Sequence, residues 1–198
     1  MIFPRTAAMA LVLLGCTAAL ATHLGALYTS GLNPLSTPIG ALTQTANAAT
    51  FHFGLWLFAL GHLAFVFLLN RSGAGRFTRG AQLFLLLDAA LIAWLPRYFA
   101  AVPAATLESG ASGGPMWLLG GGVGFAMTCV AFALWRRDRS AALLTVVCLL
   151  LWTGLAPAFL LVDSAWIGAY QRFVGAVLLT WTAAVAVMIG LGKRSGTW

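Results

Sequence analysis

Six apolar segments dominate this chain, and each is long enough to cross the hydrocarbon core of a bilayer. They cover about residues 7–28, 51–69, 81–101, 116–135, 141–162 and 173–192. A helix of about 20 residues spans about 30 Å. Because lipid offers no partners to backbone polar groups, such segments must be helical. The sequence therefore predicts an all-α, polytopic membrane bundle with six transmembrane helices, forming a single domain over residues 1–198.

The charged residues are few, and most of them lie between the apolar segments. Only 8% of the residues are charged, whereas a soluble domain has about a quarter. The net charge is +7, but the basic residues form short clusters, a pattern typical of membrane orientation and not of nucleic-acid binding. Nine of the eleven fall on one predicted side: Arg5, Arg71, Arg76, Arg79, Arg136, Arg137, Arg139, Lys193 and Arg194. The positive-inside rule then places both termini in the cytoplasm.

The first loop on the opposite side, residues 29–50, contains no charged residue. Thr37 and Pro38 form a helix-start signal, in which a capping hydroxyl precedes proline in the first turn. Ile39, Leu42 and Ala46 then recur at helical spacing. We expect a short helix that lies on the outer membrane face or caps the bundle. The alternative is a polar loop that only joins two spans.

Two short stretches carry a resemblance to a known family. They are "NPLSTPIGAL" with "ANAATFHFGLWLFALG" around the second span, and "GAYQRFVGAVLLTW" around the sixth. They resemble a bacterial family of six-helix membrane proteins that is catalogued as domain of unknown function 998. The family's Gly-x-x-Glu/Gln-Arg start of helix six corresponds to Gly168, Gln171 and Arg172, whereas His52 stands where the family commonly has an amide. The resemblance implies the six-helix fold and no particular reaction.

Ionisable groups inside a membrane are costly and mark functional candidates, and two of those in the predicted spans stand out. His62 and Asp88 lie at similar depths on consecutive antiparallel spans, so we expect them to form a hydrogen-bonded pair. The functional interpretation of this pair is a proton relay or a ligand anchor. The structural alternative is a polar clip between two helices.

A second polar group gathers near the outer side. Arg97 and Arg172 break the positive-inside pattern, which suggests that specific partners hold them. Asp163 and Glu108 are the available carboxylates, and His52 is predicted to lie near the same outer side. One interpretation is an Arg–Asp clip that locks three spans together. The other is a binding site for an anionic lipid headgroup or small anion beneath the outer loop.

The sequence predicts neither a metal ion nor a cofactor. Cys16, Cys129 and Cys148 lie separately within apolar runs, without a CxxC pair. Two histidines, His23 and His52, could ligate a b-type haem, but His52 lies at the predicted membrane edge. Zinc-hydrolase spacings, a serine nucleophile elbow and a phosphate-binding glycine loop are absent from the sequence.

Three function classes follow. The favoured one is a non-enzymatic protein of the bacterial inner membrane, which binds a lipid or small amphiphile in its periplasmic half. The alternatives are a small intramembrane enzyme with His/Asp acid–base chemistry, and a transporter. The bacterial assignment rests on the abundance of Ala, Leu, Gly and Arg over Lys. Membrane lipids are the predicted partners; a second copy or a partner membrane protein stays open, and nucleic acid is not expected.

Overall fold

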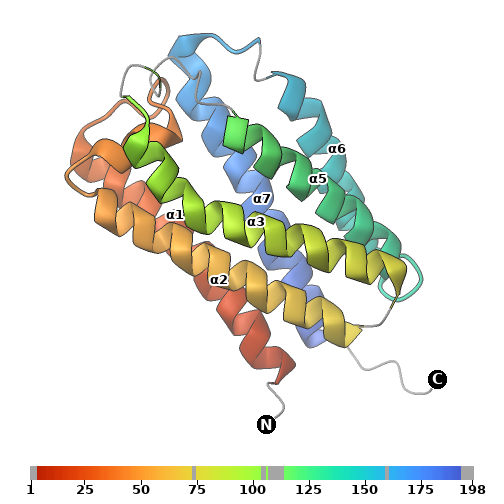
Figure 1. Cartoon of the computed structure of the whole chain (residues 1–198). Helices are drawn as coiled ribbons and strands as arrows, with labels where there is room; N and C mark the ends of the chain where they lie inside the picture. The colour runs from red at the N-terminus through yellow and green to blue at the C-terminus, as the bar shows by residue number, and fades with distance from the viewer. Residues whose placement is uncertain (1–3, 73–74, 104–105, 107–113, 159–160, 193–198) are drawn as a thin grey trace.

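The computed structural model describes residues 4–72, 75–103, 106, 114–158 and 161–192. In these residues the regular secondary structure is helical and contains no strand (Figure 1). The all-α bundle is confirmed, and each predicted span coincides with one helix. The elements are α1 (Arg5–Ser30), η1 (Ile39–Gln44), α2 (Ala48–Ser72), α3 (Arg76–Ala101), α5 (Gly114–Leu134), α6 (Arg139–Ala158), η2 (Ser164–Trp166) and α7 (Ile167–Leu191), where η denotes a 3-10 helix.

The helices have the length and composition of a multi-pass membrane protein. Within the described residues, α1, α2, α3, α5 and α7 are long and apolar enough to cross a membrane, and α6 carries a shorter apolar stretch, Arg139–Leu155. The last helix begins at Ile167, earlier than the predicted residue 173. Hydropathy alone placed its start too late, because Gln171 and Arg172 in its first two turns are polar.

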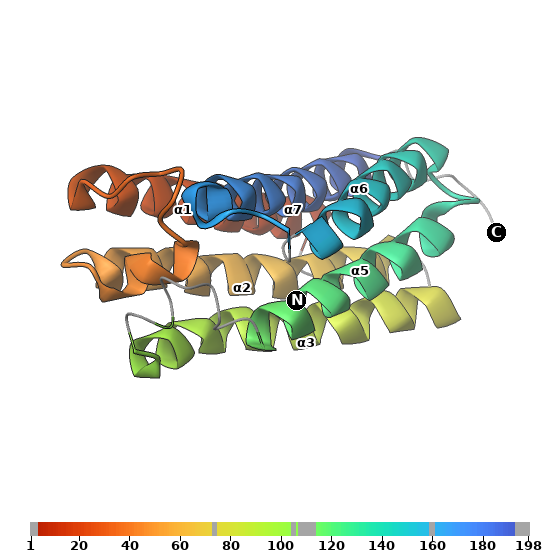
Figure 2. The same ribbon diagram turned by 90° about the horizontal axis from the view of Figure 1, so that it is seen from above.

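The six long helices form a closed ring in which each packs against its neighbours in the chain. The ring closes where α7 packs against α1, and α2 also contacts α7 across it. Seen from above, α1, α7 and α6 lie along one side of the bundle, and α2, α3 and α5 along the other (Figure 2). We call the end with residues 31–47 the outer end and the opposite one the inner end. At the inner end, Arg5 Nη2 donates to the carbonyl of Arg71 at 2.7 Å.

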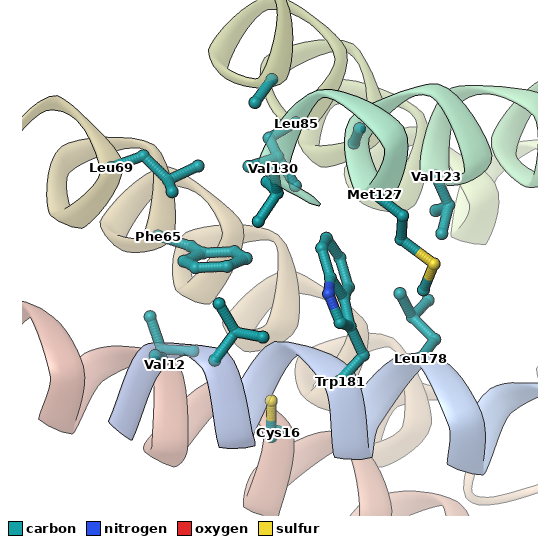
Figure 3. Close-up of a cluster of buried hydrophobic side chains, with 14 of the residues drawn as sticks. Val12, Cys16, Phe65, Leu69, Leu85, Val123, Met127, Val130, Leu178 and Trp181 are labelled. Atoms are coloured by element: carbon teal, nitrogen blue, oxygen red, sulfur yellow. The ribbon is translucent and has the colours of Figure 1, made fainter. Parts of the chain in front are cut away.

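The centre of the ring is filled by apolar side chains from several helices. Figure 3 shows this core, in which Val12 and Cys16 of α1 face residues of α2, α3, α5 and α7. Trp181 of α7 is fully buried, and its ring lies 5.5 Å from that of Phe65. Its indole N–H donates to Thr145 Oγ1 at 3.3 Å. A buried indole needs such a partner, so this bond fixes α7 against α6.

Small residues let α1 and α2 approach closely. A Cβ on Gly15 would lie 2.7 Å from the carbonyl oxygen of Leu57 and 3.2 Å from Cα of Gly61. Thr22 lies two turns further along α1, and a Cβ on Gly54 of α2 would overlap its side chain. Close backbone approach is the usual way in which helices associate in lipid, where dispersion replaces the hydrophobic drive. Glycines therefore allow the backbones of α1 and α2 to lie close together.

Candidate functional site

The site is built on the chain between α1 and α2, which folds back over the outer end of the bundle. We call residues 33–45 the outer segment. Helix α1 ends at Gly31, whose φ of 65° turns the chain in the left-handed conformation that glycine tolerates. The predicted short helix is present as η1, with Pro38 at its N-cap position and no side-chain cap. The predicted capping role of the Thr37 hydroxyl is thus wrong.

Arg172 of α7 holds the first half of the outer segment. Its Nη1 donates to the carbonyls of Pro34 at 2.7 Å and of Thr37 at 2.9 Å. Its Nε donates to Nε2 of His23 on α1 at 3.1 Å. Because an arginine Nε–H can only donate, His23 Nε2 must be the unprotonated acceptor of this bond. One guanidinium therefore links α7, α1 and the outer segment.

The neighbours of Arg172 on α7 complete this attachment. Gln171 Oε1 accepts a hydrogen bond from the backbone N–H of Ile39 at 2.8 Å, at the start of η1. The backbone N–H of Ala169 donates to the carbonyl of Leu35 at 2.9 Å. A Cβ on Gly168 would overlap the carbonyl of Thr37, so only glycine lets the segment lie this close to α7.

The other end of η1 is attached to α3. Gln44 Nε2 donates to the carbonyl of Val102 at 2.8 Å, just beyond the last turn of α3. Beneath η1, Leu42 is fully buried and packs in a small cluster with Ala26 and Phe51. The outer segment therefore caps the bundle between α7 and α3, which is one of the two placements predicted for it.

The partners of Arg172 are all uncharged. Its three hydrogen bonds go to two carbonyls and an unprotonated histidine, and its Nη2 is buried without a partner. The predicted Arg–Asp clip is not formed among the described residues. Asp163 is exposed and its carboxylate instead accepts from the N–H of Ala165, capping η2 at 2.8 Å. Glu108, the second candidate carboxylate, lies outside the described residues.

The two remaining predicted residues of the outer end lie on α2 and α3. Arg97 is exposed in the outer half of α3, next to Trp94 and Tyr98, whose rings lie 5.1 Å apart. His52 is half-buried in the first turns of α2, and its Nε2 is buried without a hydrogen-bond partner. Neither side chain joins the network around Arg172.

His62 and Asp88 are both fully buried inside the bundle, as the sequence indicated. The predicted hydrogen bond between them is not formed. His62 Nδ1 contacts the carbonyl of Phe58 at 3.2 Å within its own helix, and both carboxyl oxygens of Asp88 have no partner. The carboxyl faces α5 instead, where a Cβ on Gly122 would overlap it.

Sequence reasoning missed the roles of Gln44 and His23 in this site. Gln44 reaches from η1 to the carbonyl of Val102, just beyond the end of α3. An amide side chain in a charge-free loop is a usable signal, because it can donate to backbone carbonyls that need a hydrogen-bond partner. Among the described residues there is no group of three or more His, Cys, Asp or Glu side chains that could hold a metal ion.

No protein-family model, curated protein or solved structure matches this chain.

Proposed function

We propose that this protein is a non-enzymatic integral protein of the bacterial inner membrane, which binds the anionic headgroup of a lipid or small amphiphile in its periplasmic half. The proposal rests on the uncompensated charge of Arg172. Its guanidinium is half-buried at the outer end of α7, has only uncharged partners and leaves Nη2 without an acceptor. A buried cation is stabilised by an anion, and a phosphate or carboxylate accepts the fork of arginine donors.

The surroundings favour an amphiphile over a soluble anion. Gln44 ties η1 to the end of α3, so Arg97 of α3 lies at the outer end of the bundle on the other side of the outer segment. It supplies a second, exposed cation there. Next to Arg97, Trp94 exposes 45% of its side chain on the outside of the bundle. A cation beside an exposed aromatic ring near a helix end is the arrangement expected where a lipid headgroup lies above its acyl chains. Gly168, Gln171 and Arg172 also carry the proposed membership in the family of domain of unknown function 998.

The test is native mass spectrometry of the full chain released from a mild detergent. The wild-type protein is expected to retain a discrete adduct with the mass of an anionic lipid. Arg172→Gln and Arg97→Gln should each lower the adduct fraction by about tenfold, which corresponds to a lost charge-assisted contact of about 1.4 kcal/mol. Arg136→Gln, an exposed arginine of the inner end, is the matched control and should keep the adduct.

Two results would contradict this function. The first is a wild-type protein without any adduct after reconstitution with anionic lipid and gentle release. The second is an adduct that both outer variants retain as well as the Arg136→Gln control does. Because Arg97 is exposed and outside the hydrogen-bond network of the site, its variant reports on binding even if Arg172→Gln disturbs the outer segment.

A further inference from the structure

Asp88 lies in the middle of the bundle and is not explained by the outer site. It is fully buried, about 18 Å from either end of α3 at 1.5 Å per residue. Neither of its carboxyl oxygens has a hydrogen-bond partner. An unpartnered buried polar group is rare and costs free energy, so its presence requires a reason.

The environment of Asp88 supplies no counter-charge. Helix α3 packs against α2, α5 and η1, and η1 lies far away at the outer end. From α5 the carboxyl meets Gly122, and the nearest titratable group of α5, Cys129, packs against Gly80 two turns away. From α2 the titratable group at this depth is His62. An ionised carboxylate without a partner in such a place costs far more than a neutral acid.

One glycine of α5, Gly122, makes room for this carboxyl. A Cβ on Gly122 would overlap Asp88 Oδ1, so the carboxyl occupies the space that a side chain would fill. On other faces of α5, the indole of Trp152 lies over Gly120 and Gly124, and its N–H donates to the carbonyl of Gly120 at 2.8 Å. The carboxyl is therefore packed closely against α5 at Gly122.

His62 presents the complementary group. Its Nδ1 lies 3.2 Å from the carbonyl of Phe58, so Nδ1 carries the hydrogen and Nε2 is an acceptor. That Nε2 is buried and has no donor. Trp56 Nε1 donates to the carbonyl of Ala93, and Gln82 Nε2 to that of Val66, which fixes the register of α2 and α3. This register places His62 and Asp88 within about 3 Å of the same depth.

We propose that Asp88 is a proton-binding site in the middle of the bundle, and that His62 Nε2 is the acceptor to which its proton is released. In the packing observed here Asp88 is the neutral acid. When the carboxyl swings from Gly122 toward α2, its O–H bond breaks and an N–H bond forms on Nε2. The products are a carboxylate and an imidazolium whose charges attract each other, and the reverse transfer restores the neutral pair.

The first test is infrared spectroscopy of the full chain in lipid nanodiscs at neutral pH. The carbonyl stretch of a protonated carboxylic acid should be present in the wild type and absent in Asp88→Asn. Asp163→Asn is the control, because Asp163 is exposed and its loss should leave the band unchanged. A wild type without the band, or an Asp88→Asn variant that keeps it, would overturn the proposal. Dicyclohexylcarbodiimide, which modifies protonated carboxyls in apolar sites, should label Asp88 of the unmutated protein, so the test does not depend on a variant that folds.

The second test addresses the release of the proton. After transfer into D₂O the same band shifts as the Asp88 O–H exchanges. His62→Phe removes the acceptor and should slow this exchange by about tenfold or more, since a positioned base commonly speeds proton transfer by larger factors. His52→Phe, a histidine of the same helix near the outer end, should leave the rate unchanged. An exchange rate that is equal in wild type and His62→Phe would exclude His62 as the acceptor.

Discussion

At the scale of single residues, the contact between Asp88 and Gly122 makes a specific demand on the sequence. Gly122→Ala places a methyl group where Asp88 Oδ1 lies, so α3 and α5 must separate or the carboxyl must move. We expect a loss of about 1–3 kcal/mol in the free energy of unfolding, the range typical of overpacked interiors. Denaturant unfolding of the purified protein in detergent micelles measures this loss.

The neighbouring glycine gives a matched control for that prediction. Gly121 is exposed on the same helix, and a Cβ there meets nothing within 4 Å. Gly121→Ala should be neutral or stabilise α5 by up to about 1 kcal/mol, because alanine has the higher helix propensity. Replacing Asp88 by alanine should suppress the cost of Gly122→Ala. Equal stability of the Gly121→Ala and Gly122→Ala variants would mean that the two helices do not meet at Gly122.

Gln171 is the residue that protects the start of η1. Its Oε1 accepts the Ile39 N–H, so Gln171→Leu leaves that amide without its acceptor. Losing one such bond costs about 1–3 kcal/mol, and hydrogen exchange of peptides covering residues 35–42 should become about 5- to 100-fold faster. Gln44→Leu, which detaches η1 from α3, is the comparison. It should change this exchange less, and equal protection in the wild type and Gln171→Leu would contradict the bond.

The residues of the site were only partly predictable. Arg172 was singled out because it breaks the charge pattern, and the structure does hold it with specific partners. One of the two interpretations gave it a carboxylate partner, whereas the partners in the structure are two carbonyls and His23. Backbone carbonyls carry no sequence signature, and which of them turn toward α7 depends on the path of the outer segment. For a similar reason the sequence did not indicate that the buried carboxyl of Asp88 faces a glycine and not His62.

At the scale of helices, the pair α1 and α2 depends on small residues at its crossing. Gly15 is buried, and a Cβ there would lie 2.7 Å from the carbonyl oxygen of Leu57, which belongs to the backbone and cannot rotate away. Gly15→Ala should therefore force the helices apart and lower the free energy of unfolding by about 1–3 kcal/mol. Thermal unfolding in detergent, followed by circular dichroism, measures the change.

Gly25 is the control on the same helix. It is exposed, and nothing lies within 4 Å of its Cβ position, so Gly25→Ala should not lower the melting temperature. A Gly15→Ala protein as stable as the Gly25→Ala protein would show that α1 and α2 are packed less closely than described. Because both substitutions have the same chemistry, only the inter-helix contact distinguishes them.

The existence and order of the helices followed from hydropathy, whereas their ends did not. Apolar runs of about 20 residues leave little alternative to a helix in lipid. The ends are set by local bonds instead, as at α7, which begins before the polar pair Gln171 and Arg172. The short η1 is likewise held at both ends by tertiary bonds: Gln171 of α7 accepts from the Ile39 N–H, and the side chain of Gln44 donates to the carbonyl of Val102. Such tertiary bonds are not visible in a periodicity.

At the scale of the whole molecule, the two ends of the ring differ in charge. The described arginines of the inner end include Arg71, Arg76 and Arg139, whose guanidinium groups lie within 6 Å of the rings of Phe67, Phe77 and Trp135. The outer end holds the charge-free outer segment with Arg97 and Arg172. Arginines that extend from aromatic belts are typical of a cytoplasmic membrane surface. This asymmetry sets the expected orientation of the bundle.

The last prediction tests that orientation and the crossing of α6, the helix with the shortest apolar stretch. Single cysteines replace Leu35, Ser140 and Ser164, all exposed, in a background whose three native cysteines are alanine. A membrane-impermeant maleimide added to intact cells should label positions 35 and 164, which the bond from Ala169 N–H to the Leu35 carbonyl places at one end. Position 140, at the inner start of α6, should react only after permeabilisation. Labelling of 140 and 164 from the same side would mean that α6 does not cross, whereas labelling of 140 alone would mean that the whole bundle is inverted.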